Sequence, residues 1–128
     1  MKKFTLVAVT LFLFWPSVWA QQVERPEATQ NPNVPYRLFN TTNIYTFLQL
    51  DTRNGRVWQL QWGKTKDRLV VPINARALVA NETPGRFTLY STKNMYTYIL
   101  LDQETGESWQ VQWSVSDDRF REPIASVD

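Results

Sequence analysis

Two aspartates at matching places in the chain are of the residue type that acid–base hydrolysis requires. Asp51 opens the segment DTRNG and Asp102 opens DQETG. A glycoside hydrolase places two carboxyl groups on either side of the bond that it cleaves. The same residues also suit a turn, in which the carboxylate accepts backbone N–H groups while Gly55 or Gly106 adopts a positive φ. We favour the turn and keep the hydrolase as a less favoured alternative.

The residue types that most other catalytic sites need are missing from the sequence. The chain contains no His and no Cys, which removes the usual nucleophile–base pairs and the common nitrogen and sulfur metal ligands. We therefore expect a protein that is not an enzyme, with no catalytic residue, no metal site and no cofactor. The segments TTN, residues 41–43, and TKN, residues 92–94, are predicted to form bends. The Asp-Arg pairs at 67–68 and 118–119 are predicted to start strands and to make separate surface contacts.

Trp and Gln alternate in two nearly identical segments, WQLQW at residues 58–62 and WQVQW at residues 109–113. Successive side chains of a strand point to opposite faces, so the tryptophans of each segment share one face and the glutamines share the other. A domain of about 90 residues without a disulfide depends on burying its large apolar groups. We therefore expect all four tryptophans in the core and the glutamines facing outward.

These segments belong to a tandem repeat that accounts for most of the chain. Residues 36–74 match residues 87–125 at 16 of 39 positions, with an offset of 51 and no gap. Each copy shows the two-residue alternation of β-strands. The predicted strands are residues 37–40, 44–51, 56–62 and 68–71 in the first copy and 88–91, 95–102, 107–113 and 119–122 in the second.

Two further local features complete this prediction of secondary structure. Pro72 and Pro123 are expected to end the last strand of each copy, because proline cannot donate to a strand ladder. The segment NARALVA, residues 74–80, is expected to form one short helical turn before the break at Pro84 and Gly85.

The hairpin between the second and third strands of each copy decides which side chains share a face. A three-residue loop at residues 53–55 pairs Leu50 with Trp58 and leaves one face entirely apolar. A four-residue loop slips the register by one and places Tyr45 opposite Trp62. We favour the three-residue loop because of its apolar face.

With that register, the other face carries tyrosine and glutamine side chains together. Aromatic planes beside amide groups suit sugars and peptide surfaces. The predicted ligand-binding residues are Tyr45, Gln59, Gln61, Tyr96, Gln110 and Gln112.

The N-terminal residues have the pattern of a secretory signal peptide. Lys2 and Lys3 precede an apolar run of about twelve residues, shorter than the roughly 20 that span a bilayer, and small residues suit cleavage after Ala20. The predicted organisation is a signal peptide (1–20), a flexible proline-containing linker (21–35) and one β domain (36–128). Within that domain a connector (75–86) joins repeat 1 (36–74) to repeat 2 (87–128).

Removal of this leader changes the charge balance. The full chain has 14 basic and 12 acidic side chains, so loss of Lys2 and Lys3 leaves 12 of each. No basic surplus then remains to bind a phosphate backbone, and nucleic acid is not an expected partner. We expect a protein that is exported, either to the periplasm or secreted, and that does not span a membrane after cleavage.

The hairpins LDTRNGRVW and LDQETGESW carry a resemblance that covers residues 36–74 and 87–125. They resemble the tandem LDxxTGxxW hairpins of small uncharacterised secreted bacterial proteins, a group with no function to transfer. They are similar, more loosely, to the outer hairpins of β-propeller blades. That similarity implies units of four strands, whereas a ring needs at least about four such blades and one chain supplies two.

The sequence therefore predicts an all-β fold of two tandem antiparallel meanders. We expect them to pack their Trp-Leu-Trp faces together as a sandwich or flattened barrel related by a pseudo-twofold. The predicted function is an exported, non-enzymatic binding or interaction module whose ligand the sequence does not identify; a carbohydrate is one candidate. The alternative is a protein-partner role in the cell envelope, as an inhibitor or assembly component, so the expected partner is a glycan or an envelope protein.

Overall fold

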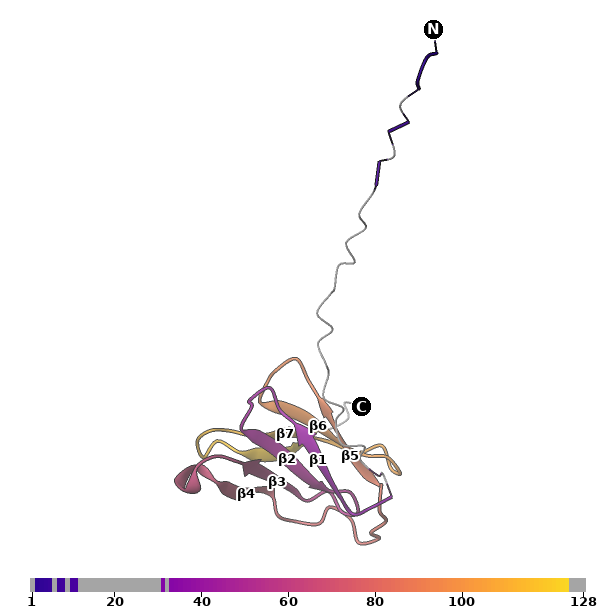
Figure 1. Cartoon of the computed structure of the whole chain (residues 1–128). Helices are drawn as coiled ribbons and strands as arrows, with labels where there is room; N and C mark the ends of the chain where they lie inside the picture. Colours follow the sequence, from indigo (N-terminus) through magenta and orange to yellow (C-terminus); the bar gives the residue numbers. More distant parts are fainter. Residues whose placement is uncertain (1, 6, 9, 12–30, 32, 125–128) are drawn as a thin grey trace.

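The computed structural model describes residues 2–5, 7–8, 10–11, 31 and 33–124, and nearly all of its regular elements are β-strands (Figure 1). Sheet 1 is an antiparallel meander of β1 (Tyr36–Asn40), β2 (Thr46–Asp51), β3 (Val57–Gln61) and β4 (Leu69–Asn74). Sheet 2 repeats it with β5 (Phe87–Ser91), β6 (Thr97–Asp102), β7 (Ser108–Gln112) and β8 (Phe120–Pro123). The predicted all-β fold of two antiparallel meanders is confirmed, and the sheets do not close into a barrel.

The last strands end differently in the two sheets. β8 ends at Pro123 as predicted, but β4 continues through Pro72 to Asn74. Both prolines lie on edge strands, where the missing N–H leaves no ladder partner unpaired.

The predicted helical turn at residues 74–80 was wrong. The structure has a loop there, and the short 3-10 helix η1 (Thr65–Asp67) lies between β3 and β4 instead. Tertiary contacts hold the loop open: the Asn74 side chain donates to the Gly55 carbonyl at 2.9 Å. The Leu78 N–H donates to the Asn54 carbonyl at 2.8 Å, which removes it from any helical bond.

The hairpins β2–β3 and β6–β7 have the four-residue loop, so the favoured three-residue register was wrong. Leu48 pairs with Gln59, and β6 pairs with β7 in the equivalent way. The Asp51 N–H donates to the Arg56 carbonyl at 2.9 Å and closes the first hairpin. Inside the loop, the Asp51 carbonyl accepts the Gly55 N–H at 3.0 Å.

This register gives each sheet a tryptophan face and a glutamine face. The tryptophan face is the side that carries the two Trp residues of the WQxQW segment, and the glutamine face is the opposite side. Sheet 1 buries its glutamine face, whereas sheet 2 buries its tryptophan face. The buried side chains include Leu48, Leu50, Val57 and Gln59 from sheet 1 and Phe87, Leu89, Tyr98, Leu100, Trp109, Val111 and Trp113 from sheet 2.

The two repeats therefore pack front to back. The expected contact between two Trp-Leu-Trp faces related by a pseudo-twofold was wrong, because Trp58 is only half-buried and Trp62 is exposed on the outside of sheet 1. β2 has apolar side chains on both sides, so the glutamine face of sheet 1 can supply Leu48 and Leu50 to the core. The apolar count that favoured one face of repeat 1 therefore did not identify the buried face.

Buried side chains join the two sheets by hydrogen bonds: the Tyr98 hydroxyl donates to the Asn40 carbonyl, and Gln59 bonds to Ser114. The fully buried Gln59 amide donates to the Ser114 carbonyl at 2.9 Å and accepts the Ser114 N–H at 3.2 Å. Arg119 donates to the same Gln59 oxygen at 2.7 Å and to the Ser114 carbonyl at 2.9 Å. Because these bonds satisfy both ends of the amide, the desolvation cost of its burial is largely offset.

Most of the predicted signal peptide and linker lies outside the described residues, which leave out 12–30. In the part of the chain that the structure covers, no helix has the length and apolar character to cross a membrane. Export therefore stays a prediction.

Gly55 and Gly106 provide a matched test of this packing, because both have φ 80° but only one is covered. A Cβ on Gly55 would lie 2.8 Å from Leu78 and 3.1 Å from Phe87, whereas one on Gly106 meets nothing within 4 Å. We expect Gly106→Ala to lower the free energy of unfolding by about 1 kcal/mol through backbone strain alone. Gly55→Ala should cost about 1 kcal/mol more from crowding. Urea unfolding at low protein concentration measures both, and equal losses would contradict the front-to-back packing.

Candidate functional site

The two aspartates considered for hydrolysis act as turn caps. The Asp51 carboxylate accepts the Arg53 backbone N–H at 3.1 Å and pairs with the Arg53 guanidinium through Nε at 3.0 Å and Nη2 at 2.9 Å. The Asp102 carboxylate accepts the Glu104 N–H and the Thr105 hydroxyl and is paired with Arg86 at 2.8 Å. The turn interpretation is confirmed.

The protonation of these carboxylates follows from their partners. Burial on its own raises the pKa of Asp102, but hydrogen bonds from Arg86, Glu104 and Thr105 outweigh it and hold the pKa at about 2. Burial likewise raises the pKa of Asp51, and the hydrogen bonds from Arg53 outweigh it, so the net pKa is lowered. A glycoside hydrolase needs one carboxyl group with a raised pKa to act as the general acid, and neither aspartate has the shift that this role requires.

The four glutamines predicted to bind ligand do not share one surface. Gln59 is enclosed between the sheets, and Gln110 is half-buried on the outer face of sheet 2. Gln61 donates to the Asp67 carbonyl at 3.1 Å, and Gln112 donates to the Asp118 carbonyl at 3.4 Å. Each glutamine therefore fixes the loop that follows its own strand, between β3 and β4 or between β7 and β8. The prediction that these tyrosines and glutamines share a face was wrong, because the four-residue loop puts the tyrosines on the side opposite to the glutamines.

Tyr45 and Tyr96 each lie against a tryptophan of their own sheet. The Tyr45 and Trp62 ring centroids are 5.0 Å apart at 52°, and those of Tyr96 and Trp113 are 4.9 Å apart at 51°. The indole Nε1 donates to a backbone carbonyl in both, at 2.7 Å in the first pair and 2.8 Å in the second. The two pairs therefore have the same local geometry.

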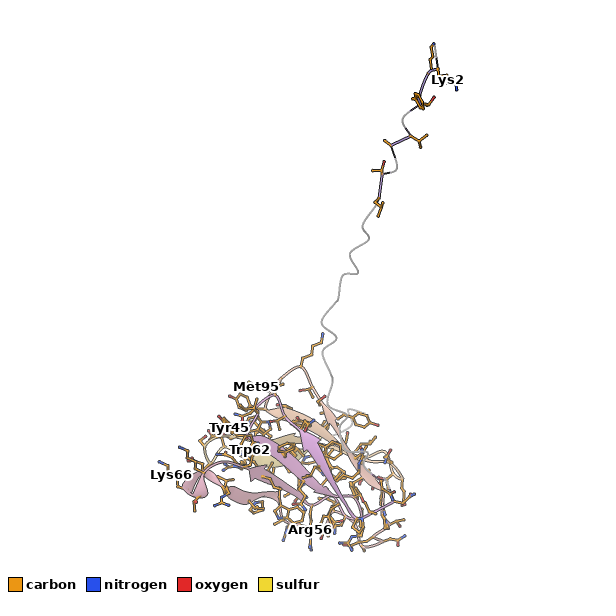
Figure 2. The ribbon with its side chains drawn as sticks, viewed as in Figure 1. Lys2, Tyr45, Arg56, Trp62, Lys66 and Met95 are labelled. Atoms are coloured by element: carbon orange, nitrogen blue, oxygen red, sulfur yellow. The ribbon has the colours of Figure 1, made fainter. Side chains whose placement is uncertain are left out.

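Their surroundings are different. Trp113 is fully buried under sheet 1, whereas Trp62 is 53% exposed. Because the Trp62 N–H is already bonded, what Trp62 offers to solvent is apolar ring surface. Figure 2 shows Tyr45, Trp62 and Lys66 toward one end of the domain and Arg56 away from them.

Trp62 borders two hollows on the outside of sheet 1. One is lined mostly by apolar residues, and the other by two aromatic residues together with charged and polar ones. The first is lined by Leu38, Phe47, Leu60, Gln61, Trp62, Arg68, Leu69 and Val70. The second is lined by Tyr45, Gln61, Trp62, Gly63, Lys64, Lys66 and Asp67.

We call the apolar part of this surface, Tyr45, Phe47, Leu60, Trp62 and Val70, the outer tryptophan face. It is the candidate functional site. The sequence interpretation placed its tryptophan in the core and so missed it. The signal that could have found it was the four-residue loop, which sets Tyr45 opposite Trp62.

The loops around this face follow the sequence. In the bend at residues 41–43, the Asn43 side chain accepts the Tyr45 N–H at 2.9 Å, and residues 92–94 repeat this arrangement. The Asp-Arg pairs differ between repeats: Arg68 donates to the Thr65 hydroxyl at 3.0 Å, whereas Arg119 reaches across to Gln59. The expectation of separate surface contacts therefore fails for Arg119, because sheet 1 covers its end of sheet 2.

Among the described residues, no group of three or more His, Cys, Asp or Glu side chains is placed to hold a metal ion. Comparison with known proteins found no matching family model, curated protein or solved structure. The functional argument therefore rests on the geometry of this chain.

The equivalent positions Trp62 and Trp113 give a direct test of the site. We expect Trp113→Ala to lower the free energy of unfolding by about 3–5 kcal/mol, because it removes a fully buried ring. Trp62→Ala should cost about 1 kcal/mol, because half of that ring is in water. Urea unfolding at low protein concentration compares them. Similar losses for the two variants would show that Trp62 belongs to the core.

Proposed function

We propose that the chain is a non-enzymatic interaction module that binds a partner protein through the outer tryptophan face. The observation that supports this most strongly is the exposed Trp62. Its repeat equivalent has the same ring partner and the same Nε1 hydrogen bond, yet is buried under another sheet. The outer tryptophan face of sheet 1 thus has the same local geometry as the tryptophan face of sheet 2, which sheet 1 covers.

The residue types on this face support the same proposal. Contiguous exposed apolar surface with a polar rim is typical of interaction sites. Trp, Tyr and Arg are the side chains that contribute most to binding energy in protein interfaces. The outer tryptophan face supplies Trp62 and Tyr45, and Arg68 lines the neighbouring hollow.

Site-specific photocrosslinking in cells that express the full chain tests this proposal. Val70 lies on the outer tryptophan face and Val115 on a loop away from it, and they are similarly exposed at 65% and 71%. We expect a photoreactive residue at position 70 to give a protein adduct of defined mass and one at position 115 to give none. No adduct at position 70, or the same adducts at both positions, would contradict the proposal.

A glycan is the second candidate ligand, supported by the hollow that the aromatic pair lines together with charged residues. Tyr45 and Trp62 offer tilted rings in a hollow that Lys64, Lys66 and Asp67 also line. Aromatic planes with adjacent polar groups are what a sugar ring requires.

Titration with a glycan panel, followed by tryptophan fluorescence, tests this second candidate. We expect a bound glycan to change the emission, and Tyr45→Ala to abolish the change. Tyr96→Ala is the matched control and should keep it, because Trp113 is covered. No response at millimolar sugar, or equal effects of both variants, would count against glycan binding.

A further inference from the structure

We propose that the partner is a second copy of this chain. The outer tryptophan face of sheet 1 binds the outer glutamine face of sheet 2 in the next copy, so that copies join head to tail in a closed ring. This inference rests on the proposed function, because it assigns an occupant to the same face.

The contact inside each chain is the template. It joins the glutamine face of one repeat to the tryptophan face of the other. The two faces left outside are the remaining tryptophan face, on sheet 1, and the remaining glutamine face, on sheet 2. Because the repeats share their register and strand order, the outer faces present the same kind of surfaces as the inner ones.

The polar contact at the centre of the template can be made again. Inside the chain, Gln59 binds the backbone N–H and C=O of Ser114. At an offset of 51 the corresponding residues are Gln110 on the outer glutamine face and Gly63 beside Trp62. Because the bond uses only backbone atoms of residue 114, a glycine at position 63 offers the same donor and acceptor.

The arginine that completes the template is also repeated, and in the junction between copies an acidic residue would lie close to it. Arg119 reaches Gln59 inside the chain, and its equivalent is Arg68. Val71 pairs with Gln59 across β3 and β4, but Glu122 pairs with Gln110 across β7 and β8. In the junction between copies, Arg68 would therefore approach Gln110 with Glu122 beside it.

The turn at the other end of the sheets shows the same complementarity. Inside the chain, the fully buried Phe87 packs on the Gly55 turn. Its equivalent, Tyr36, is 49% exposed, and the equivalent turn glycine, Gly106, has open space above it. Tyr36 of one copy can fill the space above Gly106 of the next.

The residues that differ between the two repeats make the junction between copies more polar than the contact inside the chain. Gln49 stands where sheet 2 has the buried Leu100, and Ser108 stands where sheet 1 has the buried Val57. A junction with less apolar area should be weaker than the internal contact, and its two halves are not tethered. We therefore expect an association that depends on protein concentration.

A contact between two different faces repeats from copy to copy and closes only as a ring. Four-stranded antiparallel sheets packed face to face around an axis form a propeller, which typically has four to eight blades. One chain supplies two sheets, so a ring of two to four copies falls within that range.

Light scattering after size exclusion, over a concentration series of the full chain, tests the association. We expect a discrete mass of two, three or four chains.

Arg68→Glu and Glu122→Arg should each raise the midpoint concentration of assembly at least about tenfold, and the double variant should restore most of the loss. Val115→Arg is the control and should leave the midpoint unchanged. A monomer at every concentration would overturn the inference, and so would a mass that grows without limit.

Crosslinking distinguishes head-to-tail contact from a twofold dimer. The chain has no cysteine, so Lys64→Cys and Ser108→Cys each introduce a single thiol, on opposite sides of the junction. We expect a short bismaleimide to join chains in a mixture of the two variants and in neither variant alone. Dimers from one variant alone would overturn the head-to-tail contact.

The same measurements separate this inference from the proposed function. A monomeric chain that still gives a photoadduct of another mass at position 70 would overturn the self-association and leave the interaction module standing. A monomeric chain without any adduct would overturn both.

Discussion

The hydrogen bonds of Gln59 fix how the two sheets meet. The amide is fully buried, and its donor and its acceptor are both taken by the backbone of Ser114. An unpaired amide in that position would carry the full cost of desolvation, so the sheets must be set with Gln59 directly over Ser114. In a strand, a glutamine that points inward sends its neighbours outward. The inward Gln59 therefore places Trp62 on the surface, and the exposed aromatic site is a consequence of the buried polar contact.

Much of the fold could be predicted from the sequence, because alternation and turn chemistry are local. The eight strands, their order in each sheet and the aspartate-capped turns all follow from short stretches of residues. The pairing register of the hairpins did not follow. It was inferred from the apolar content of one face, whereas β2 has apolar side chains on both faces, and packing against the other sheet decides which face is buried. A duplicated sequence gives the same pattern twice, and only tertiary packing shows that the two copies use it differently.

The candidate site could be predicted only in part. Tyr45 was identified as a ligand-binding residue and is exposed beside Trp62, but the glutamines assigned with it lie on the opposite side of the sheet. Gln59 illustrates the difficulty: glutamine is usually found in water, and nothing local to WQLQW signals that this one is buried. Its partners, Ser114 and Arg119, are more than fifty residues away in the chain, so only the tertiary structure reveals them.

The front-to-back packing has a consequence for how such a chain could have arisen. One repeat alone carries both of the complementary surfaces, so a short ancestral gene encoding a single unit would already specify the contact between separate molecules. Duplication of such a gene would turn one of these contacts into an intramolecular one, at a far higher effective concentration. The charge pairs show that the two units now differ: Asp51 is neutralised by Arg53 within its own turn, whereas Asp102 is neutralised by Arg86 from the connector between the repeats.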